Sequence, residues 1–176
     1  MGVFGWVRII PVSKNCLGVL FKDGEKILKQ VEKAGGVKMT ADKETVTVDG
    51  EPASEWLVQN VLEALSYGFV PKKALKLFSE EFFLERIDLR AALRGKDLER
   101  YKARIIGTHG KAKKTIEELT GASIAIGDES VGIMGRFDEI QAAKEGIIKI
   151  LEGATHPTVY AFLERLSRQK ARAQFM

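Results

Sequence analysis

The feature that most constrains the fold of this chain is an internal repeat with a constant offset of 85 residues. Both copies have the pattern of a helix that ends at glycine, a short strand, an acidic turn and an alternating second strand. Solenoid repeats are about 20 to 50 residues long, so this offset predicts two copies of one small domain. The alternative is a chance similarity between two ordinary helix-strand-strand segments. Residues 31–50 lie over residues 116–135, and the matched positions include Glu32 with Glu117, Gly36 with Gly121, and Gly50 with Gly135.

Hydrophobic periodicity and turn residues extend both copies to the same element order, β-α-α-β-β-α. The first copy is predicted to have a strand over 7–12, helices over 13–21 and 24–34, strands over 37–41 and 45–48, and a helix over 53–67. The second is predicted to have a strand over 84–89, helices over 97–106 and 111–120, strands over 123–126 and 130–134, and a helix over 137–152. Residues 71–78 favour a short connecting helix, and a further helix begins near residue 156. The class is α+β.

Composition excludes several kinds of protein. The formal net charge of +4 permits a polyanionic partner without requiring one. The single cysteine, Cys16, rules out an internal disulfide and a cysteine-rich zinc site, and the two histidines, His109 and His156, have no partners at ligand spacing. No apolar run approaches the roughly 20 residues that cross a bilayer, and the first residues lack the pattern of a secretory signal. We therefore expect a cytoplasmic protein with no membrane partner, no metal, no cofactor and no catalytic activity.

The segment that points to chemistry is the loop Gly107-Thr108-His109-Gly110, which joins two helices of the second copy. Two glycines allow a sharp turn and a close approach of the backbone to a ligand, and the amides at the start of the following helix favour phosphate. Six basic residues and no acid lie between positions 100 and 114, which suits a sugar-phosphate backbone. The alternative is a solvated basic turn in which the glycines only mark the end of one helix and the start of the next.

The residues around this loop resemble a known family. The run Ile105-Ile106-Gly107-x-x-Gly110-Lys111-x-x-x-x-Ile116 is similar to the signature of a type I KH domain, whose loop clamps about four single-stranded nucleotides. The Tyr67-Gly68-Phe69-x-Pro71 segment and the segment Gly153-Ala154-x-His156-x-x-Val159-Tyr160-x-Phe162-Leu163 resemble the tandem-KH small-subunit ribosome assembly factors, the Dim-two-like or partner-of-NOB family.

The resemblance implies two tandem type I KH domains, each with a three-stranded antiparallel sheet packed by three helices, followed by a C-terminal helix. The expected limits are residues 1–69 for the first domain, 70–82 for a connecting helix, 83–153 for the second domain, and 154–176 for the C-terminal helix and tail. The implied partners are single-stranded RNA at the 3′ region of small-subunit, 16S-type rRNA and the NOB-type maturation endonuclease or other assembly and translation factors. A KH-fold scaffold for proteins and a KH regulator of other RNAs are the alternatives.

The two copies are not expected to bind RNA equally. The loop of the first copy is matched as Phe21-Lys22-Asp23-Gly24, so Phe21 replaces the first glycine and Asp23 repels phosphate. This predicts a poor clamp that is structural or docks a protein, with a weak electrostatic role left open for Lys22. In the second copy, phosphates are expected at the glycine loop. The candidates for an apolar floor under the bases are Ile106, Ile116, Ile124 and Ile126, of which Ile116 at least is expected to be core. Base edges are expected to be read by backbone groups of residues 123–126 and by side chains such as Arg104. The candidate RNA-binding residues are Arg100, Lys102, Arg104, Ile106, Gly107, Thr108, His109, Gly110, Lys111, Lys113, Lys114, Ser123, Ile124, Ala125 and Ile126.

Overall fold

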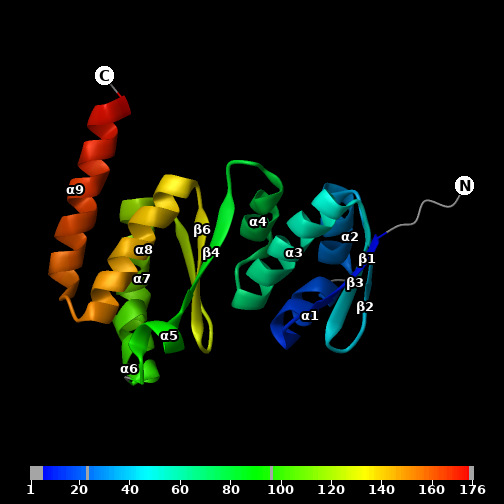
Figure 1. The fold of residues 1–176 in the computed structure, drawn as a ribbon, viewed down its shortest axis with the longest axis horizontal. Helices are drawn as coiled ribbons and strands as arrows, with labels where there is room; N and C mark the ends of the chain where they lie inside the picture. The colour runs from blue at the N-terminus through cyan, green and yellow to red at the C-terminus, as the bar shows by residue number, and fades with distance from the viewer. Residues whose placement is uncertain (1–5, 23, 96, 175–176) are drawn as a thin grey trace, which may run out of the picture. The chain divides into compact units, whose positions relative to one another are not determined.

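A computed structural model describes residues 6–22, 24–95 and 97–174 of the chain (Figure 1). The chain divides into two compact units, a first unit of residues 1–82 and a second unit of residues 83–176. Each unit contains a three-stranded antiparallel sheet, with strand orders β1-β3-β2 and β4-β6-β5, and helices pack against it. The α+β class expected from the sequence is confirmed.

The first unit follows the predicted order. Its elements are β1 (Trp6–Pro11), α1 (Lys14–Phe21), α2 (Lys26–Gly35), β2 (Lys38–Ala41), β3 (Thr45–Gly50), α3 (Pro52–Tyr67), the short helix α4 (Pro71–Ala74) and the 3-10 turn η1 (Leu75–Phe78). The segment expected to connect two domains, residues 70–82, contains α4 and η1 and packs on α3 through the buried side chains of Ala74 and Leu77. The division between the units therefore falls after Phe82.

The second unit inserts a short helix after the first strand of the repeated order and adds a long helix after its last element. Its elements are β4 (Phe83–Asp88), α5 (Leu89–Leu93), α6 (Leu98–Ile106), the 3-10 turn η2 (Thr108–Gly110), α7 (Lys111–Thr120), β5 (Ser123–Ile126), β6 (Ser130–Gly135), α8 (Phe137–Glu152) and α9 (His156–Gln174). The first strand ends one residue earlier than predicted, because the Asp88 carboxylate accepts a hydrogen bond from the Ala91 amide and starts α5. The sequence did not indicate this five-residue helix.

The repeat is present in three dimensions as well as in sequence. The bounds of α2, β2, β3 and α3 differ from those of α7, β5, β6 and α8 by 85 residues in every case. Strand pairing has the same register, since Lys38 lies opposite Asp49 and Ser123 lies opposite Met134. One side-chain contact also recurs: the Glu32 carboxylate accepts from the Met39 amide and the Glu117 carboxylate from the Ile124 amide, both at 2.7 Å. Chance similarity does not explain a shared register and a shared contact.

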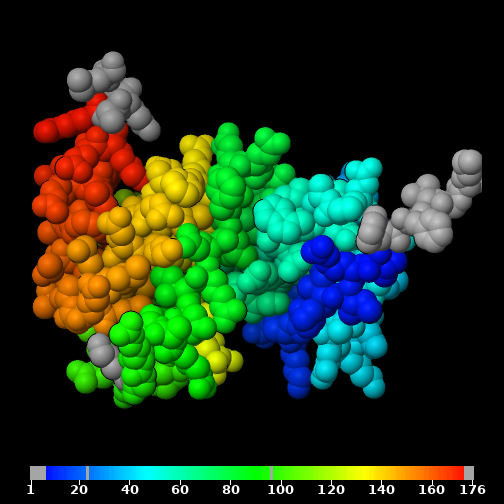
Figure 2. All heavy atoms as spheres, viewed as in Figure 1, coloured from blue at the N-terminus to red at the C-terminus, as the bar shows by residue number. Residues whose placement is uncertain are grey.

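Burial of the inward sides of sheet and helices forms a core in each unit. In the second unit, the helix α9 closes that core by inserting Val159 and Leu163, both essentially unexposed, against α7 and α8. Gly146 on α8 allows this approach, since a Cβ there would lie 3.2 Å from Leu163 Cδ1. The space-filling view shows α9, in orange and red, covering one side of this unit (Figure 2).

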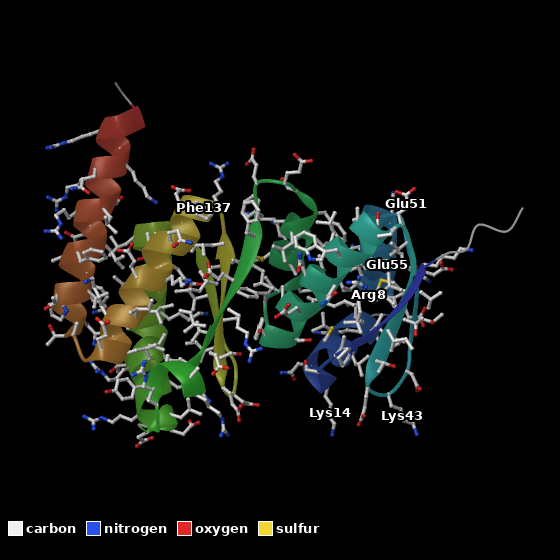
Figure 3. All side chains as sticks on the ribbon, in the orientation of Figure 1. Arg8, Lys14, Lys43, Glu51, Glu55 and Phe137 are labelled. Atoms are coloured by element: carbon white, nitrogen blue, oxygen red, sulfur yellow. The ribbon has the colours of Figure 1, made fainter. Side chains whose placement is uncertain are left out.

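The contact between sheet and long helix is polar at one matched place in each unit. In the first unit Arg8 on β1 donates to Gln59 at 2.7 Å and lies 3.5 Å from the buried carboxylate of Glu55, both on α3 (Figure 3). In the second unit Glu85 on β4 is bonded to Lys144 on α8, with the charges reversed. Among the residues that the structure describes, Glu55 Oε1 has no hydrogen-bond partner.

Two absences hold for the described ranges. None of the helices there is both long and apolar enough to cross a membrane. No three or more His, Cys, Asp or Glu side chains are grouped there in a way that could hold a metal ion.

Candidate nucleic-acid interface

The glycine loop of the second unit has the backbone conformation that its glycines allow. Gly107 ends α6 with φ 72° and ψ 173°, and its amide donates to the Ala103 carbonyl at 2.8 Å. His109 and Gly110 follow in the left-handed region, with φ 52° and 74°. Gly110 then donates to the Gly107 carbonyl at 3.1 Å, which closes the turn just before α7 begins.

The two glycines are required for different reasons. A Cβ on Gly107 would lie 2.5 Å from Ala112 Cβ and 2.7 Å from the Ala112 amide nitrogen, so α6 and α7 approach each other closely only because that atom is missing. A Cβ on Gly110 would meet nothing within 4 Å. Gly110 is therefore needed for its positive φ, and the surface above it is open.

The exposed tip of the loop is suited to an anion. Thr108 and His109 are exposed, and no side chain in the described part of the chain caps the N-terminus of α7, whose N-cap residue is Gly110. The first amides of a helix lack intrahelical acceptors and carry the positive end of the helix dipole. An uncapped N-terminus beside exposed, glycine-flanked backbone can accept phosphate oxygens.

The basic residues around the loop are less free than the sequence suggested. Lys102 is paired with Glu99 at 3.1 Å, Lys113 with Glu117 at 4.0 Å, and Lys114 with Glu118 at 3.7 Å. The acids that neutralise them lie just outside the acid-free interval. Two exposed residues, Arg100 and Lys111, have no ion-pair partner in the part of the chain that is described, so they carry most of the uncompensated charge.

The side chain of Arg104 is held in place by hydrogen bonds within the second unit. Its guanidinium donates to the carbonyls of Ile150 and Ala154 at 3.2 and 2.7 Å, which satisfies the C-terminal end of α8. His156 Nε2 lies 2.8 Å from the Arg104 carbonyl oxygen and links the start of α9 to the same place. Arg104 was expected to read base edges, but its donors serve a junction of three helices.

The apolar floor expected beside the loop is smaller than predicted. Ile116 and Ile124 are 0% and 2% exposed and belong to the core, and Ala125 is buried as well. Ile106, at the end of α6, is 37% exposed, and Ile126, at the end of β5, is partly buried. Only these two isoleucines have apolar surface for a base.

The edge strand β5 offers backbone groups beside this apolar surface. Its partner is β6, and Ser123, the half-buried first residue of β5, starts the pairing. The Ile124 amide points away from β6, because it donates to Glu117. Alternate residues of an antiparallel strand face the same edge, so the amide and carbonyl of Ile126 also face outward. Sequence reasoning missed Glu117 in this role, although its recurrence as Glu32 was a signal.

The loop of the first unit differs from the sequence-based match by one position. Helix α1 ends at Phe21 as α6 ends at Ile106, so Lys22, not Phe21, takes the place of Gly107. Glu25, with φ 64°, takes the place of Gly110. Asp23, expected to repel phosphate, lies outside the described residues. Glu25 is the N-cap residue of α2, where the second unit has Gly110, and its side chain makes no capping hydrogen bond with the described residues.

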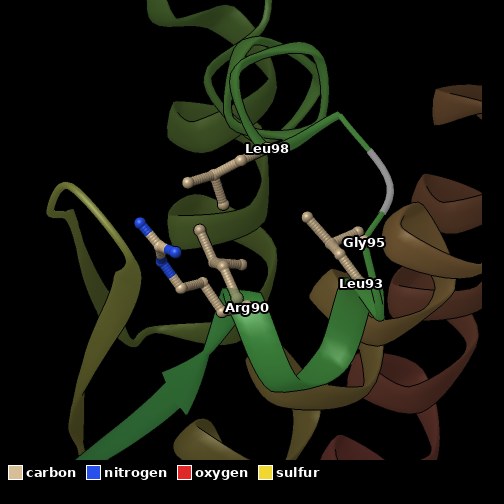
Figure 4. A pocket seen from close by; sticks show the side chains of 5 residues that line it. Arg90, Leu93, Gly95 and Leu98 are labelled. Atoms are coloured by element: carbon tan, nitrogen blue, oxygen red, sulfur yellow. The ribbon is translucent and has the colours of Figure 1, made fainter.

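A small pocket of about 300 Å³ lies at the other end of α6 (Figure 4). Leu89, Leu93 and Leu98 line it together with Gly95 and Arg90, and Arg90 is paired with Glu129. The pocket is mostly aliphatic and shares no residue with the glycine loop.

Comparison with known proteins agrees with this geometry. Residues 83–168 match the family model described as a eukaryotic type KH-domain (KH-domain type I), built on the second KH domain of PNO1. A KH domain-containing protein of Methanocaldococcus jannaschii is 37% identical over 176 residues, covering 96% of this chain and 78% of that protein. The chain belongs to the Dim2/PNO1 family of KH-domain proteins.

Two further members of the Dim2/PNO1 family show what is known of such chains. The pre-rRNA-processing protein pno1 of Emericella nidulans is 29% identical over 119 residues, which cover 65% of this chain and 46% of that protein. Dim2p of Pyrococcus horikoshii, solved in a complex with a/eIF2α and rRNA, is 30% identical with a TM-score of 0.86. That match covers 95% of this chain and 97% of the Dim2p chain.

Proposed function

We propose that this protein binds single-stranded RNA in the assembly of the small ribosomal subunit, at the 3′ region of 16S-type rRNA. The observation that carries the proposal is the loop from Gly107 to Gly110, where exposed backbone flanked by two glycines adjoins the N-terminus of α7, which no described side chain caps. Pre-rRNA processing by one relative and an rRNA complex of another support the choice of RNA. A binding role, and not catalysis, is the function that these residues support.

In the proposed complex, phosphate oxygens lie against the loop and the first amides of α7, with Arg100 and Lys111 supplying charge. Bases turn toward the apolar surface of Ile106 and Ile126. The outward amide and carbonyl of Ile126 then read a base edge. No aromatic side chain is present on β5, so stacking of the kind seen on aromatic RNA-binding sheets has no part in this binding.

We also propose that both units are KH domains and that the border between them lies at Phe82 and Phe83. The shared register and the recurring carboxylate contact support this. With Lys22 and Glu25 in place of the two glycines, the first domain lacks a clamp. We assign it to protein contacts, for which a NOB-type endonuclease and a translation factor are the candidate partners.

The experiment is fluorescence anisotropy with a short single strand from the 3′ end of small-subunit rRNA. Thr108→Asp/His109→Asp places two carboxylates at the exposed loop tip without touching the close contact at Gly107. Lys22→Asp, in the first unit, lowers the net charge by the same two units and serves as the control. We expect affinity to fall at least tenfold only in the double variant, with an unchanged circular dichroism spectrum.

Equal affinity in all three proteins would exclude the loop as the binding site. That result would favour the alternative function, a scaffold for other proteins. A scrambled RNA of the same length separates a preference for the rRNA sequence from general binding to single strands. Equal affinity for both sequences would support the alternative of a KH protein that acts on other RNAs.

A further inference from the structure

The outer edge of strand β1 in the first unit is an unpaired strand edge. The strand order β1-β3-β2 places β1 at one side of the sheet, and no strand among the described residues pairs with its outer edge. The Val12 amide donates to the carbonyl of Glu44, just before β3, at 3.0 Å. Alternate residues of an antiparallel strand face the same neighbour, so the amides and carbonyls of Val7 and Ile9 point outward. These backbone groups can pair with an added strand.

The same two residues present apolar side chains to solvent. Ile10 is in the core and Arg8 reaches α3, so Val7 and Ile9 lie on the opposite face of the sheet. Val7 is 60% exposed and Ile9 is 67% exposed. Exposed β-branched residues on an unpaired edge strand favour pairing with another chain, and proteins usually prevent such pairing by placing charge on the edge.

The second unit shows that the fold does not require an apolar edge. Strand β4 pairs with β6 in the same register in which β1 pairs with β3. In that register Arg86 and Asp88 stand at the places of Ile9 and Pro11, and their side chains form an exposed ion pair at 3.9 Å. The second unit therefore has charged protection at this edge, and the first unit lacks it. This difference between two copies of one fold indicates a role that belongs to the first copy.

An exposed aromatic side chain lies on the helix next to this edge. Gln59 of α3 accepts a hydrogen bond from Arg8 at 2.7 Å, which places that side of α3 beside β1 (Figure 3). Trp56 is three residues earlier on α3, so it neighbours Gln59 on the helix surface, and it is 55% exposed. A strand added to β1 would place one set of side chains against Val7 and Ile9 and the alternate set toward α3. Exposed tryptophan is a frequent anchor in protein interfaces.

The chemistry of the edge selects the strand that fits it. In an added antiparallel strand, the residue opposite Arg8 lies on the helix side of the sheet, next to a side chain that is 41% exposed. Glu55 and Gln59 occupy only part of the five N–H donors of this arginine, so a carboxylate on the added strand can accept from the others. The residues on either side of that carboxylate lie beside Val7 and Ile9. The segment that fits is therefore extended, with an acidic residue between two apolar ones.

A second copy of this chain fits the edge poorly. Pairing two β1 strands through Val7 and Ile9 about a twofold axis places the two copies of Arg8 opposite each other, and like charges directly opposite destabilise a sheet. Moving the axis to Ile9 places Pro11 opposite Val7, and proline has no amide to donate. A different protein is therefore the better occupant.

We propose that the outer edge of β1 is a docking site for an extended segment of another protein, which joins the three-stranded sheet as a further antiparallel strand. The segment carries an acidic residue opposite Arg8 and apolar residues beside Val7 and Ile9. The proposal rests on the assignment of the first unit to protein contacts, to which it gives a place. It does not depend on RNA binding by the loop of the second unit.

The probe is a fluorescein-labelled synthetic peptide with the core Thr-Val-Glu-Val-Thr, and its binding to the full chain is measured by fluorescence anisotropy. Two N-methylated peptides test the backbone pairing. Methyl groups on the valine nitrogens remove the amides that face β1, whereas a methyl group on the glutamate nitrogen removes an amide that faces away. A peptide with lysine in place of glutamate tests the carboxylate without any change in the protein.

Two protein variants complete the test. Ile9→Arg introduces the residue type found at the matched position 86, which the same fold accepts in the second unit. Thr40→Arg is the matched control, because Thr40 is exposed at the opposite edge of the same sheet and the variant gains the same charge. The loop variant Thr108→Asp/His109→Asp is measured as well, with the peptide and with RNA.

We expect Ile9→Arg, the lysine peptide and the valine-methylated peptide each to weaken binding by about tenfold or more. Thr40→Arg and the glutamate-methylated peptide are expected to stay within about twofold of their parents. The amide signals of Val7 and Ile9 should shift when the peptide is added. RNA affinity should be unchanged in Ile9→Arg, and peptide affinity should be unchanged in the loop variant.

Equal binding of the two methylated peptides, or unchanged affinity in Ile9→Arg, would overturn the proposal. So would a failure of the glutamate peptide to bind the wild-type chain. If sedimentation shows a dimer that Ile9→Arg separates, a second copy occupies the edge and the proposed occupant is wrong. A loop effect on RNA without peptide binding would keep the proposed function and remove this site, and the reverse pattern would do the opposite.

Discussion

Replacing Gly107 by alanine tests the close approach of α6 and α7. The new Cβ would lie 2.5 Å from Ala112 Cβ and 2.7 Å from the Ala112 amide nitrogen. The second of these atoms is backbone, so no rotamer change relieves the clash. The glycine also has φ 72° and ψ 173°, a region that L residues with side chains almost never adopt.

The expected loss has two parts. Holding a non-glycine residue in this backbone region costs about 1–3 kcal/mol, and forcing an extra carbon into a packed contact costs about 1–3 kcal/mol. The sum, about 2–6 kcal/mol, is a large share of the roughly 5–15 kcal/mol by which a domain is stable. Gly110→Ala is the matched control, because its Cβ meets open space and only the left-handed backbone costs about 1–2 kcal/mol.

Urea denaturation of both variants, followed by circular dichroism, measures the difference. Trp56 lies on α3 of the first unit, so its fluorescence follows that unit, while amide exchange at Ile105 and Ile116 follows the second. We expect Gly107→Ala to reduce exchange protection in the second unit far more than Gly110→Ala. Equal losses in the two variants would refute the argument from close packing and leave backbone strain as the whole effect.

Three further expectations concern residues away from the loop tip. Arg104→Met should lower the free energy of unfolding by roughly 2–3 kcal/mol, because two charge-assisted bonds to the end of α8 are lost, while Arg100→Met should change it by less than about 0.5 kcal/mol; equal effects in urea titrations would show that the helix junction does not depend on Arg104. Glu55→Ile, which introduces the residue type found at the matched position 140, should raise stability by about 1 kcal/mol by removing a buried carboxylate with an unpartnered oxygen, and a clear loss of thermal stability would contradict this. Burial raises the pKa of the Cys16 thiol from 9.0 to about 11, against a smaller lowering by Ser66, so Ellman's reagent should react at pH 8 only with unfolded chain. Because that pKa is raised, the neutral thiol's contribution to stability is fully present below pH 9 and is lost as the pH rises through about 11; rapid labelling of folded protein would contradict the burial.

Most of the fold could be predicted from the sequence, because its main helices and strands give clear patterns and occur in both copies of the repeat. Helix α7 and strand β5 have the predicted bounds, and the strands and helices of both units were placed within about two residues. Helix α5 was missed because five residues give no measurable periodicity, and what starts it is a single aspartate cap.

The site was predicted less completely, because its details depend on contacts between distant residues. The glycine loop is a feature of the local sequence, and its place between two helices was predicted correctly. The partners of Arg104 lie 46 and 50 residues away along the chain, which no local pattern reveals. The burial of Ile124 likewise depends on which side of β5 faces the core. The match of Phe21 with Gly107 failed because the helix end, not the glycine in the loop, sets the register.

The carboxylates of Glu32 and Glu117 each occupy one amide on the outer edge of a sheet. A strand from another molecule needs an unbroken series of edge amides and carbonyls, so it could join β2 or β5 only by displacing a charged acceptor. Sheet edges are the usual starting point of aggregation, and charge placed on them is a common protection. A ligand that needs a single amide and carbonyl, as one base does, is not excluded in this way. The same contact thus protects this sheet edge of each unit against addition of a strand from another molecule, and it leaves a single edge amide and carbonyl available to a small ligand.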